Sequence, residues 1–349
     1  MNVQENIPLA PLTTLEVGGP ARYFVHAETE EDVVEAFEYA CSNGLDVFVL
    51  GGGSNILVSD KGFDGLVIRI GLTGMSVEGG VVTAAAGENW DSLVDRCVGK
   101  NLAGVECLSG IPGTVGGTPV QNVGAYGQEV SDTVVSVRCF DRTINDIVEL
   151  SNADCRFDYR TSVFNTAERE RYIVLSVNYR LEPNGAAKIV YKDLIEHFAG
   201  RRPTLAETRE AVLSIRRSKS MVIDDNDENR RSAGSFFKNP IVGQAKFDEI
   251  SFAFGGKVPH FPASDGSVKI PAAWLIEHAG FHKGYAKGNV GISTRHTLAI
   301  VNRGGATAAE IVNLKNEIQK AVAKKFGIDL APEPIFVGDH EAKIDFTHV

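Results

Sequence analysis

The sequence lacks the features that would place this chain in several large protein classes. Its five cysteines, Cys41, Cys97, Cys107, Cys139 and Cys155, contain no C-x-x-C pair, so neither a disulfide framework nor a zinc site is indicated. No apolar run approaches the roughly 18 residues that a membrane span needs, and the opening MNVQENIPLAPL has no basic signal segment. We therefore expect a cytoplasmic protein that is neither exported nor inserted into a membrane.

Positive charge is outnumbered by negative charge, with 35 Lys and Arg against 45 Asp and Glu. The formal net charge is −10, which argues against binding nucleic acid through a basic face. It does not exclude a nucleotide, because distant surface charge is screened beyond ~8 Å at physiological salt. The eight histidines include no H-E-x-x-H and no pair at metal-ligand spacing, so we assign no metal.

Two common nucleotide-binding motifs are missing. A Rossmann fingerprint needs G-x-G-x-x-G or A between a strand and a helix, but Gly51 and Gly53 are followed by Ile56 and a strand-like pattern. A P-loop needs lysine and then serine or threonine after its last glycine, and Gly116-Gly117-Thr118 has no nearby lysine. ATP hydrolysis thus loses its main support.

Glycine, in contrast, is concentrated in two loops. Ser109–Gly127 reads SGIPGTVGGTPVQNVGAYG, with six glycines and no charged side chain. A buried strand, Val47–Leu50, leads directly into Gly51-Gly52-Gly53-Ser54-Asn55. Glycine brings bare backbone N–H groups close to an anion, so two such loops favour a dinucleotide held along both edges. The alternative is that the glycines only make tight turns.

The remaining pattern predicts an α+β protein. Strands and helices mix in the first half without regular βαβ units, and a length of 349 residues suggests two or three lobes at ~150 residues per domain. Asp224–Arg231 is a polar run that we interpret as a solvated loop, and the best boundary falls near 205–220. We expect helices over 29–44, 90–100, 204–219, 271–280 and 307–327, and strands over 47–50, 77–86, 134–140 and 172–179.

Three segments combine groups suited to catalysis. Ser235 lies beside a glycine and two aromatic residues in GSFFKNP, which suits a desolvated proton donor or an incidental strand serine. Glu333 lies between two prolines that restrict the backbone, although the segment could equally be an exposed tail. Arg160 lies among aromatic residues, suited to a forked contact with a carboxylate or to an ordinary salt bridge.

Taken together, these motifs resemble one family. The order is Leu12-Thr13-Thr14-Leu15 with Gly18-Gly19, then GGGSN, SGIPGTVGG with NVGAYG, CRFDYRTSVF, AGSFFKNP and PEP. This order is similar to that of the UDP-N-acetylenolpyruvoylglucosamine reductases (MurB). The resemblance extends from about Leu12 to Gly338 and is far more specific than any single loop.

The resemblance implies a non-covalently bound FAD in a lobe of the p-cresol methylhydroxylase/vanillyl-alcohol oxidase type, and a smaller α+β substrate-binding domain. We expect an FAD-binding region over 1–205, made of two lobes with a core at about 17–184. A substrate-binding domain would follow over 206–330, and a C-terminal segment over 331–349 would carry Glu333. The expected oligomeric state is a monomer.

The resemblance also implies site residues. Arg160, Ser235 and Glu333 match the catalytic positions, with Ser235 as proton donor. Tyr191 matches the substrate-closing tyrosine of the longer subclass, and Lys219 and Asn239 match positions that line the nucleotide-sugar site. The acidic stretch 224–228 departs from the shorter segment of better-known members. The expected FAD-binding residues are Gly51, Gly52, Gly53, Ser54, Asn55, Ser109, Gly110, Ile111, Gly113, Gly116, Gly117, Asn122, Gly124, Ala125 and Tyr126.

The implied reaction is the NADPH-dependent reduction of UDP-N-acetyl-enolpyruvoylglucosamine to UDP-N-acetylmuramate in peptidoglycan precursor synthesis. Holding the enolpyruvyl carboxylate and stabilising its developing negative charge suits Arg160, and Glu333 with its proton or a bound water, while Ser235 would deliver the proton. One alternative is an FAD oxidase of the same fold, which the lack of His or Cys in the glycine loops disfavours. The other is a nucleotide-sugar-binding regulator, which has no need of Ser235 and Glu333.

Overall fold

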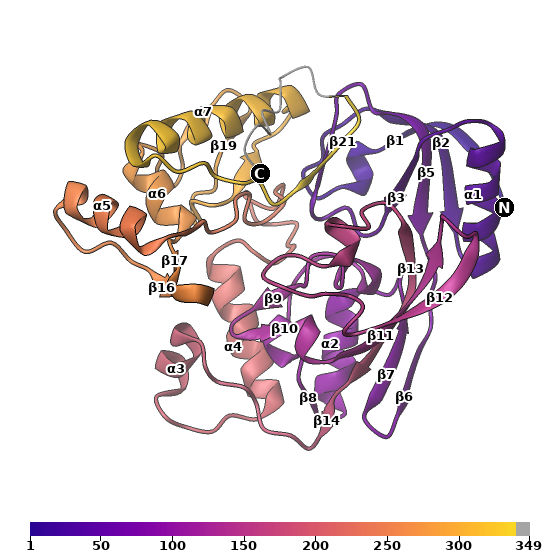
Figure 1. Cartoon of the computed structure of the whole chain (residues 1–349), viewed down its shortest axis with the longest axis horizontal. Helices are drawn as coiled ribbons and strands as arrows, with labels where there is room; N and C mark the ends of the chain where they lie inside the picture. Colours follow the sequence, from indigo (N-terminus) through magenta and orange to yellow (C-terminus); the bar gives the residue numbers. More distant parts are fainter. Residues whose placement is uncertain (340–349) are drawn as a thin grey trace. The chain divides into compact units, whose positions relative to one another are not determined.

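The structure, a computed structural model, describes residues 1–339, which form two compact units that interleave along the chain (Figure 1). The first unit contains Met1–Ile7, Ala21–Gly53 and Asp64–Ile223. The second contains Pro8–Pro20, Ser54–Phe63 and the described residues from Asp224 to Asp339. Residues 340–349 of the expected C-terminal segment lie outside the described residues.

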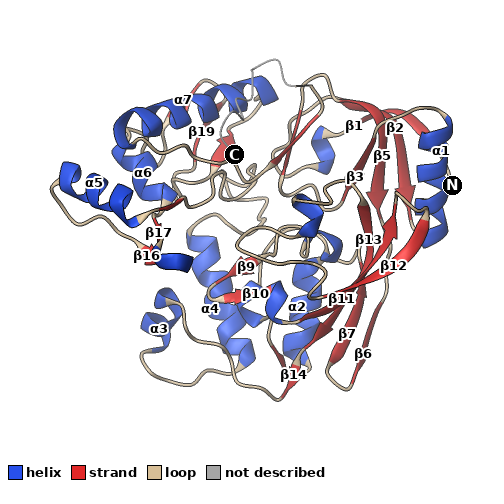
Figure 2. Ribbon diagram, viewed as in Figure 1, coloured by secondary structure: helices blue, strands red, loops and turns tan. Residues whose placement is uncertain are grey.

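A five-stranded antiparallel sheet dominates the first unit (Figure 2). The expected strands over 134–140 and 172–179 are confirmed as its central pair, β11 and β13. The expected single strand over 77–86 is wrong, because Gly79 and Gly80 both adopt positive φ and fold this stretch into a hairpin. In spatial order the strands are β12 (Asp146–Ser151), β11 (Val134–Asp141), β13 (Tyr172–Arg180), β7 (Val81–Ala85) and β6 (Met75–Glu78).

A second, four-stranded sheet in this unit leads to the first glycine loop. Its strands, in spatial order, are β1 (Gln4–Pro8), β2 (Pro20–Ala27), β5 (Phe63–Ile70) and β3 (Val47–Leu50). Helix α1 (Glu30–Ser42) begins with the expected capping box, in which Thr29 accepts from the Asp32 N–H and Asp32 accepts from the Thr29 N–H. Strand β3 pairs in parallel with β5 and ends at Leu50, immediately before Gly51.

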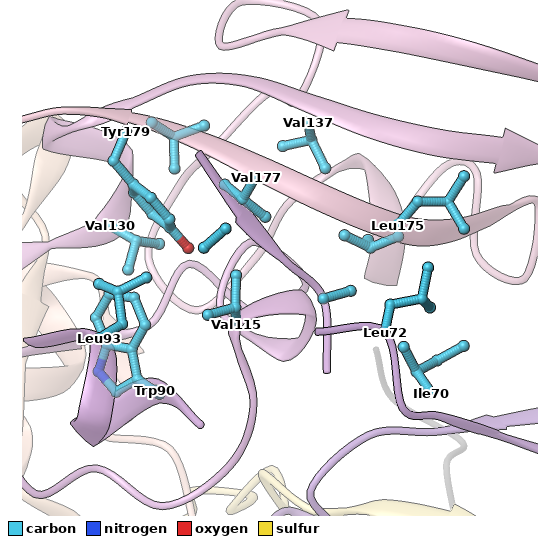
Figure 3. Close-up of a cluster of buried hydrophobic side chains, with 14 of the residues drawn as sticks. Ile70, Leu72, Trp90, Leu93, Val115, Val130, Val137, Leu175, Val177 and Tyr179 are labelled. Carbon is cyan, nitrogen blue, oxygen red and sulfur yellow. The ribbon is translucent and has the colours of Figure 1, made fainter. Parts of the chain in front are cut away.

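Helix α2 (Trp90–Gly99) packs into the core beside the five-stranded sheet. Figure 3 shows Trp90 and Leu93 facing Tyr179, Val177 and Val115 in this cluster. The Trp90 indole N–H donates to the Leu108 carbonyl at 3.0 Å, so this fully buried ring leaves no donor unsatisfied. Burial of a side chain of this size contributes about 1.5–3 kcal/mol, which anchors the start of α2 beneath the second glycine loop.

The other elements of the first unit are short strands and two further helices. Helix α4 begins with the expected capping box at Thr204 and ends at Ser218, before the C-cap Lys219. The elements are β8 (Leu102–Ala103), β9 (Gly124–Ala125), β10 (Gln128–Glu129), β14 (Glu182–Pro183), α3 (Lys192–Phe198) and α4 (Leu205–Ser218). Single 3-10 turns span Glu106–Leu108, Val115–Gly117, Val130–Asp132 and Val163–Asn165 in this unit, and Ala10–Leu12 and Ser264–Gly266 in the second.

The second unit combines three helices with small sheets. The long helix expected over 307–327 is confirmed as α7, with a capping box at Thr307 and a left-handed Gly327 at its end. Asp60 reinforces its start, because the carboxylate accepts the N–H groups of Ala308 and Ala309 at 2.7 and 2.9 Å. The elements are β15 (Ile241–Val242), α5 (Gln244–Phe254), β16 (Phe261–Pro262), β17 (Val268–Lys269), α6 (Ala272–His278), β18 (Ala286–Lys287), β19 (Val290–Ile292), β20 (Ile300–Asn302) and α7 (Ala308–Phe326).

One strand pair in the second unit joins distant parts of the sequence. Strand β4 (Ile56–Val58) pairs in parallel with β21 (Ile335–Val337). Asn55 extends this pairing, since its carbonyl accepts the Ile335 N–H at 3.0 Å. Within residues 1–339, no helix has both the length and the apolar character to cross a bilayer.

Candidate active site

The two glycine loops meet in the first unit through their backbones. A Cβ on Gly52 would lie 2.6 Å from the Gly113 Cα, and a Cβ on Gly51 would lie 2.9 Å from the Thr114 Oγ1. A Cβ on Gly52 would meet backbone that cannot turn away, so contact between the loops requires glycine at this position. The expected pair of glycine loops therefore forms one continuous backbone surface.

Asp91, at the start of α2, holds the second glycine loop in place. Its Oδ1 accepts hydrogen bonds from the Gly110 N–H at 2.6 Å and from Nη1 of Arg209 at 2.6 Å. Its Oδ2 accepts a hydrogen bond from Nη2 of Arg209 at 2.9 Å. Burial raises the pKa of the Asp91 carboxyl, but the hydrogen bonds from Arg209 and Gly110 outweigh it and leave that pKa below its usual value. Asp91 is thus a charged clamp between α2, α4 and the loop.

The NVGAYG end of the loop is held in an uncommon backbone conformation. Asn122 and Tyr126 have φ of +43° and +50°, in the left-handed region. The Asn122 side chain compensates by donating to Glu129 at 2.8 Å and accepting the Ser131 N–H at 3.1 Å. Burial raises the pKa of the Tyr126 phenol, so this ring stays neutral at physiological pH.

Arg160 lies against the same loop. Its Nη2 donates to the Gly124 carbonyl at 2.9 Å, and its own backbone is left-handed with φ of +55°. Asn165 supports the turn by donating from its side chain to the Arg160 carbonyl at 3.2 Å. The structure therefore brings the expected catalytic arginine to the edge of the expected cofactor loop.

Two expected substrate-binding residues also lie beside this loop. The Tyr191 ring packs edge-on against Tyr126, with centroids 5.3 Å apart and the Tyr191 side chain 40% exposed. Lys219, the C-cap of α4, forms an ion pair with Asp193 at 2.9 Å. Burial lowers the pKa of Lys219, but the Asp193 hydrogen bond outweighs it and the pKa is raised. Lys219 is therefore a cation at neutral pH.

In the second unit, backbone pairing brings the Ser235 segment to the Glu333 segment. The Glu333 N–H donates to the Phe236 carbonyl at 2.9 Å, and the Lys238 N–H donates to the Ala331 carbonyl at 2.9 Å. Phe236 is fully buried in the hydrophobic core of the second unit, so packing of its side chain fixes the Ser235 segment. The alternative that Glu333 lies in an exposed tail is wrong, because this pairing and the Asn55 side chain, which donates to the Glu333 carbonyl at 3.3 Å, hold it in place.

Asn239 has a structural contact in this unit. Its Oδ1 accepts the N–H of Ala272 at 2.9 Å, which satisfies the first residue of α6.

The first glycine loop divides between the units, with Gly51–Gly53 in the first and Ser54 and Asn55 in the second. Each unit therefore carries part of the expected residue set.

The arrangement in the first unit fits an FAD. Flavin adenine dinucleotide carries a pyrophosphate, which backbone N–H groups in a glycine-rich concavity can receive without a fixed cation. The close approach of Gly52 and the Gly113 backbone provides such a surface. Gly117 has open space where a Cβ would lie, which leaves room for a bound group beside the loop.

Comparison with known proteins agrees with this division. Residues 21–150 match the model of an FAD binding domain, and residues 225–337 match the C-terminal domain of UDP-N-acetylenolpyruvoylglucosamine reductase. The UDP-N-acetylenolpyruvoylglucosamine reductase of Streptomyces coelicolor is 46% identical, over 96% of this chain and 91% of the relative. The chain belongs to the UDP-N-acetylenolpyruvoylglucosamine reductase family. The expected α+β fold, with an FAD-binding domain and a second domain, is confirmed.

Other members of this reductase family show similar coverage. The reductase of Mycobacterium tuberculosis is 43% identical over 97% of this chain and 96% of its own length. The crystal structure of the reductase from Thermus caldophilus superposes with a TM-score of 0.70 at 26% identity, covering 97% of this chain and 100% of that one. Full-length similarity to reductases decides against the alternatives of an oxidase and of a regulator without turnover.

Sequence reasoning missed several residues that build the site. Asp91 and Arg209 clamp the glycine loop, and Arg216 of α4 lies against it, yet none belongs to a glycine motif. The two family models cover 21–150 and 225–337 and leave the segment between them unmatched. The only local signal was the cluster of basic residues in the last turn of α4.

Proposed function

We propose that this chain reduces UDP-N-acetyl-enolpyruvoylglucosamine to UDP-N-acetylmuramate with NADPH, in peptidoglycan precursor synthesis. It is an FAD-dependent oxidoreductase of the UDP-N-acetylmuramate dehydrogenase type, and its family membership carries this conclusion. Bound FAD supplies the chemistry by accepting hydride from NADPH and donating it to the enolpyruvyl double bond. The residues of the chain bind, orient and protonate the substrate.

The proposed catalytic residues are Arg160, Ser235 and Glu333. Arg160 binds the enolpyruvyl carboxylate, since a guanidinium matches a carboxylate in a forked geometry. Glu333 orients the same end of the substrate, and Ser235 gives a proton to its C2. The pairing of the Phe236 carbonyl with the Glu333 N–H at 2.9 Å supports this assignment, because it fixes the Ser235 and Glu333 segments to each other.

The proposed binding residues are distributed over both units. FAD is held by the two glycine loops, with Gly51 to Asn55 on one side and Ser109 to Tyr126 on the other. Tyr191, Lys219 and Asn239 bind the nucleotide sugar, and Tyr191 places the chain in the longer subclass. The charge of Lys219 suits a diphosphate.

We also propose an organisation of the whole chain. An FAD-binding region over 1–205 precedes a substrate-binding domain over 206–330, and the following segment carries Glu333. The protein acts as a monomer in the cytoplasm, without nucleic acid, metal or covalent flavin.

Ser235→Ala tests the proposed role of the serine because it separates two half-reactions. Flavin reduction by NADPH requires no proton from Ser235, so its rate stays near that of the wild type. Re-oxidation by the enolpyruvyl substrate falls by ~10²–10⁴-fold or more, the usual contribution of a positioned proton donor. Stopped-flow absorbance of the bound flavin measures both steps.

Ser251→Ala is the matched control. Ser251 belongs to the same unit, and its buried hydroxyl has no hydrogen-bond partner among the described residues, so both half-reactions remain normal. Ser235→Cys supplies another protic group at the same place and recovers part of the activity. Near-normal re-oxidation of Ser235→Ala would show that the proton comes from elsewhere.

A further inference from the structure

Arg216, in the last turn of α4, has a buried donor that the protein does not satisfy. Its Nη2 donates to the Met221 carbonyl at 2.7 Å, but its Nε is buried and has no hydrogen-bond partner within residues 1–339. A buried donor without an acceptor costs about 1–3 kcal/mol, and more when the group is charged. Such a group in a folded protein requires an explanation, and an acceptor that arrives with a ligand supplies one.

The position of Nε identifies where that acceptor would lie. A Cβ on Gly110 would be 3.4 Å from the Arg216 Nε, with side-chain atoms of Leu213 and Val222 nearer at 2.7 and 3.2 Å, so the guanidinium lies beside the first glycine of the second loop. Gly110 has φ of +70° and its N–H is fixed by Asp91. The orphaned donor therefore lies beside a rigid part of the loop.

The surrounding charges leave this guanidinium without a counter-ion. Burial lowers the pKa of the Arg216 guanidinium. The nearby Tyr126 and Asp91 partly oppose this lowering, whereas the positive charge of Arg160 adds to it. The Asp91 carboxylate is already committed to Arg209 and Gly110. No carboxylate in the described part of the chain forms an ion pair with Arg216. The guanidinium is thus positioned to receive an anionic oxygen from outside the chain.

We propose that Arg216 binds an anionic oxygen of FAD at the Gly110 edge of the second glycine loop, which makes it a cofactor-binding residue. The orphaned Nε beside Gly110 carries this inference, which rests on the proposed FAD site. Gly110 lies within the region 21–150 that matches the FAD binding domain, whereas Arg216 lies outside both matched regions. An FAD is favoured over the nucleotide sugar because the glycine loop itself forms the contact.

Two parts of FAD offer such an oxygen, the pyrophosphate and the C2 carbonyl edge of the flavin ring. Both give a charge-assisted hydrogen bond, which is stronger than a neutral one. They differ in what removal of the guanidinium changes. Loss of a pyrophosphate contact weakens binding of any adenine diphosphate, while loss at the flavin edge disfavours the reduced, more negative ring.

The test compares three variants by affinity and by redox potential. Arg216→Gln removes the charge, Arg216→Lys keeps it without the Nε donor, and Arg217→Gln is the control. Arg217 is the next residue of the helix, but its side chain is 53% exposed and pairs with Glu210. Flavin-free protein is titrated with FAD, and separately with ADP, and the midpoint potential of each FAD-loaded protein is measured.

Arg216→Gln is expected to bind FAD at least tenfold more weakly, or to have a lower midpoint potential, with Arg216→Lys intermediate and Arg217→Gln unchanged. A parallel loss of ADP affinity assigns the oxygen to the pyrophosphate. If the affinity for ADP is unchanged and the midpoint potential drops, the oxygen belongs to the flavin edge. The drop is about 30 mV for each tenfold loss of affinity for reduced FAD relative to oxidised FAD. If Arg216→Gln does not fold, as judged by circular dichroism, Arg216→Lys carries the comparison.

Other outcomes would overturn the inference. If FAD affinity and potential are those of the wild type, Arg216 does not bind FAD, whether or not affinity for the UDP-sugar falls. Failure of the proposed function is a separate observation, because in that case the wild-type protein itself would bind no FAD.

Discussion

Replacing Asp91 by asparagine tests whether this carboxylate holds the glycine loop. The substitution removes the charge that pairs with Arg209 at 2.6 and 2.9 Å and weakens the bond from the Gly110 N–H. A hydrogen bond to a charged group contributes about 1.5–3 kcal/mol, but the Asp91 side chain is 34% exposed and Asp95 also contacts Arg209. We therefore expect a total loss of about 2–3 kcal/mol, below the sum of the separate bonds.

Urea unfolding of the FAD-loaded protein, followed by far-ultraviolet circular dichroism, measures this loss. Asp95→Asn is the matched control, because Asp95 pairs with the same Arg209 at 3.0 Å but is 70% exposed. An exposed pair contributes at most about 1 kcal/mol. The Asp91 variant should also release FAD more readily, since the loop loses its anchor. Equal destabilisation by the two substitutions, or a loss below about 0.5 kcal/mol for Asp91→Asn, would refute the reasoning.

Two further predictions concern the ion pair of Asp141, at the end of β11, with Arg171, and the glycine loops. Hydrogen bonds from Arg171 lower the pKa of the Asp141 carboxyl to about 2. The ionised carboxylate therefore stabilises the folded protein at any pH above ~3.9, the pKa of an aspartate in the unfolded chain, and this stabilisation is lost as the pH falls towards 2. The difference in urea midpoint between the wild type and Asp141→Asn should narrow over that range, and a constant difference would contradict it. Gly52→Ala, whose Cβ would lie 2.6 Å from the Gly113 Cα, should weaken FAD binding at least tenfold in a fluorescence titration. Gly99→Ala, which meets nothing within 4 Å, should leave that affinity unchanged.

The sequence predicted those parts of the fold that depend on short-range signals. The helices that begin at Thr29, Thr204 and Thr307 all carry a capping box, in which the cap and its partner are three residues apart. The hairpin at 75–85 was missed because alternation continues on both sides of Gly79-Gly80 and hides the turn. Local periodicity therefore identified the elements better than their connections.

The site was predictable only where its residues belong to motifs. The glycine loops stand out in composition, but the contact of Gly52 with Gly113 joins segments about sixty residues apart. The clamp of Asp91 by Arg209 spans 118 residues, and neither residue differs from an ordinary surface charge in sequence. The left-handed backbone of Arg160 is likewise set by its surroundings, because an arginine has no intrinsic preference for positive φ.

The parallel pairing of β4 with β21 has a consequence for synthesis of the chain. Asn55 and Glu333, which flank this pair and are joined by a hydrogen bond, are 278 residues apart. At ~5–20 residues per second on the ribosome, the strand Ile56–Val58 emerges on the order of tens of seconds before its partner. These three apolar residues are buried in the folded protein. Until their partner strand Ile335–Val337 is synthesised, they form a strand edge without its hydrogen-bonding partner. The second unit therefore cannot complete this strand pair until Ile335–Val337 has been synthesised, long after the chain of the first unit has been made.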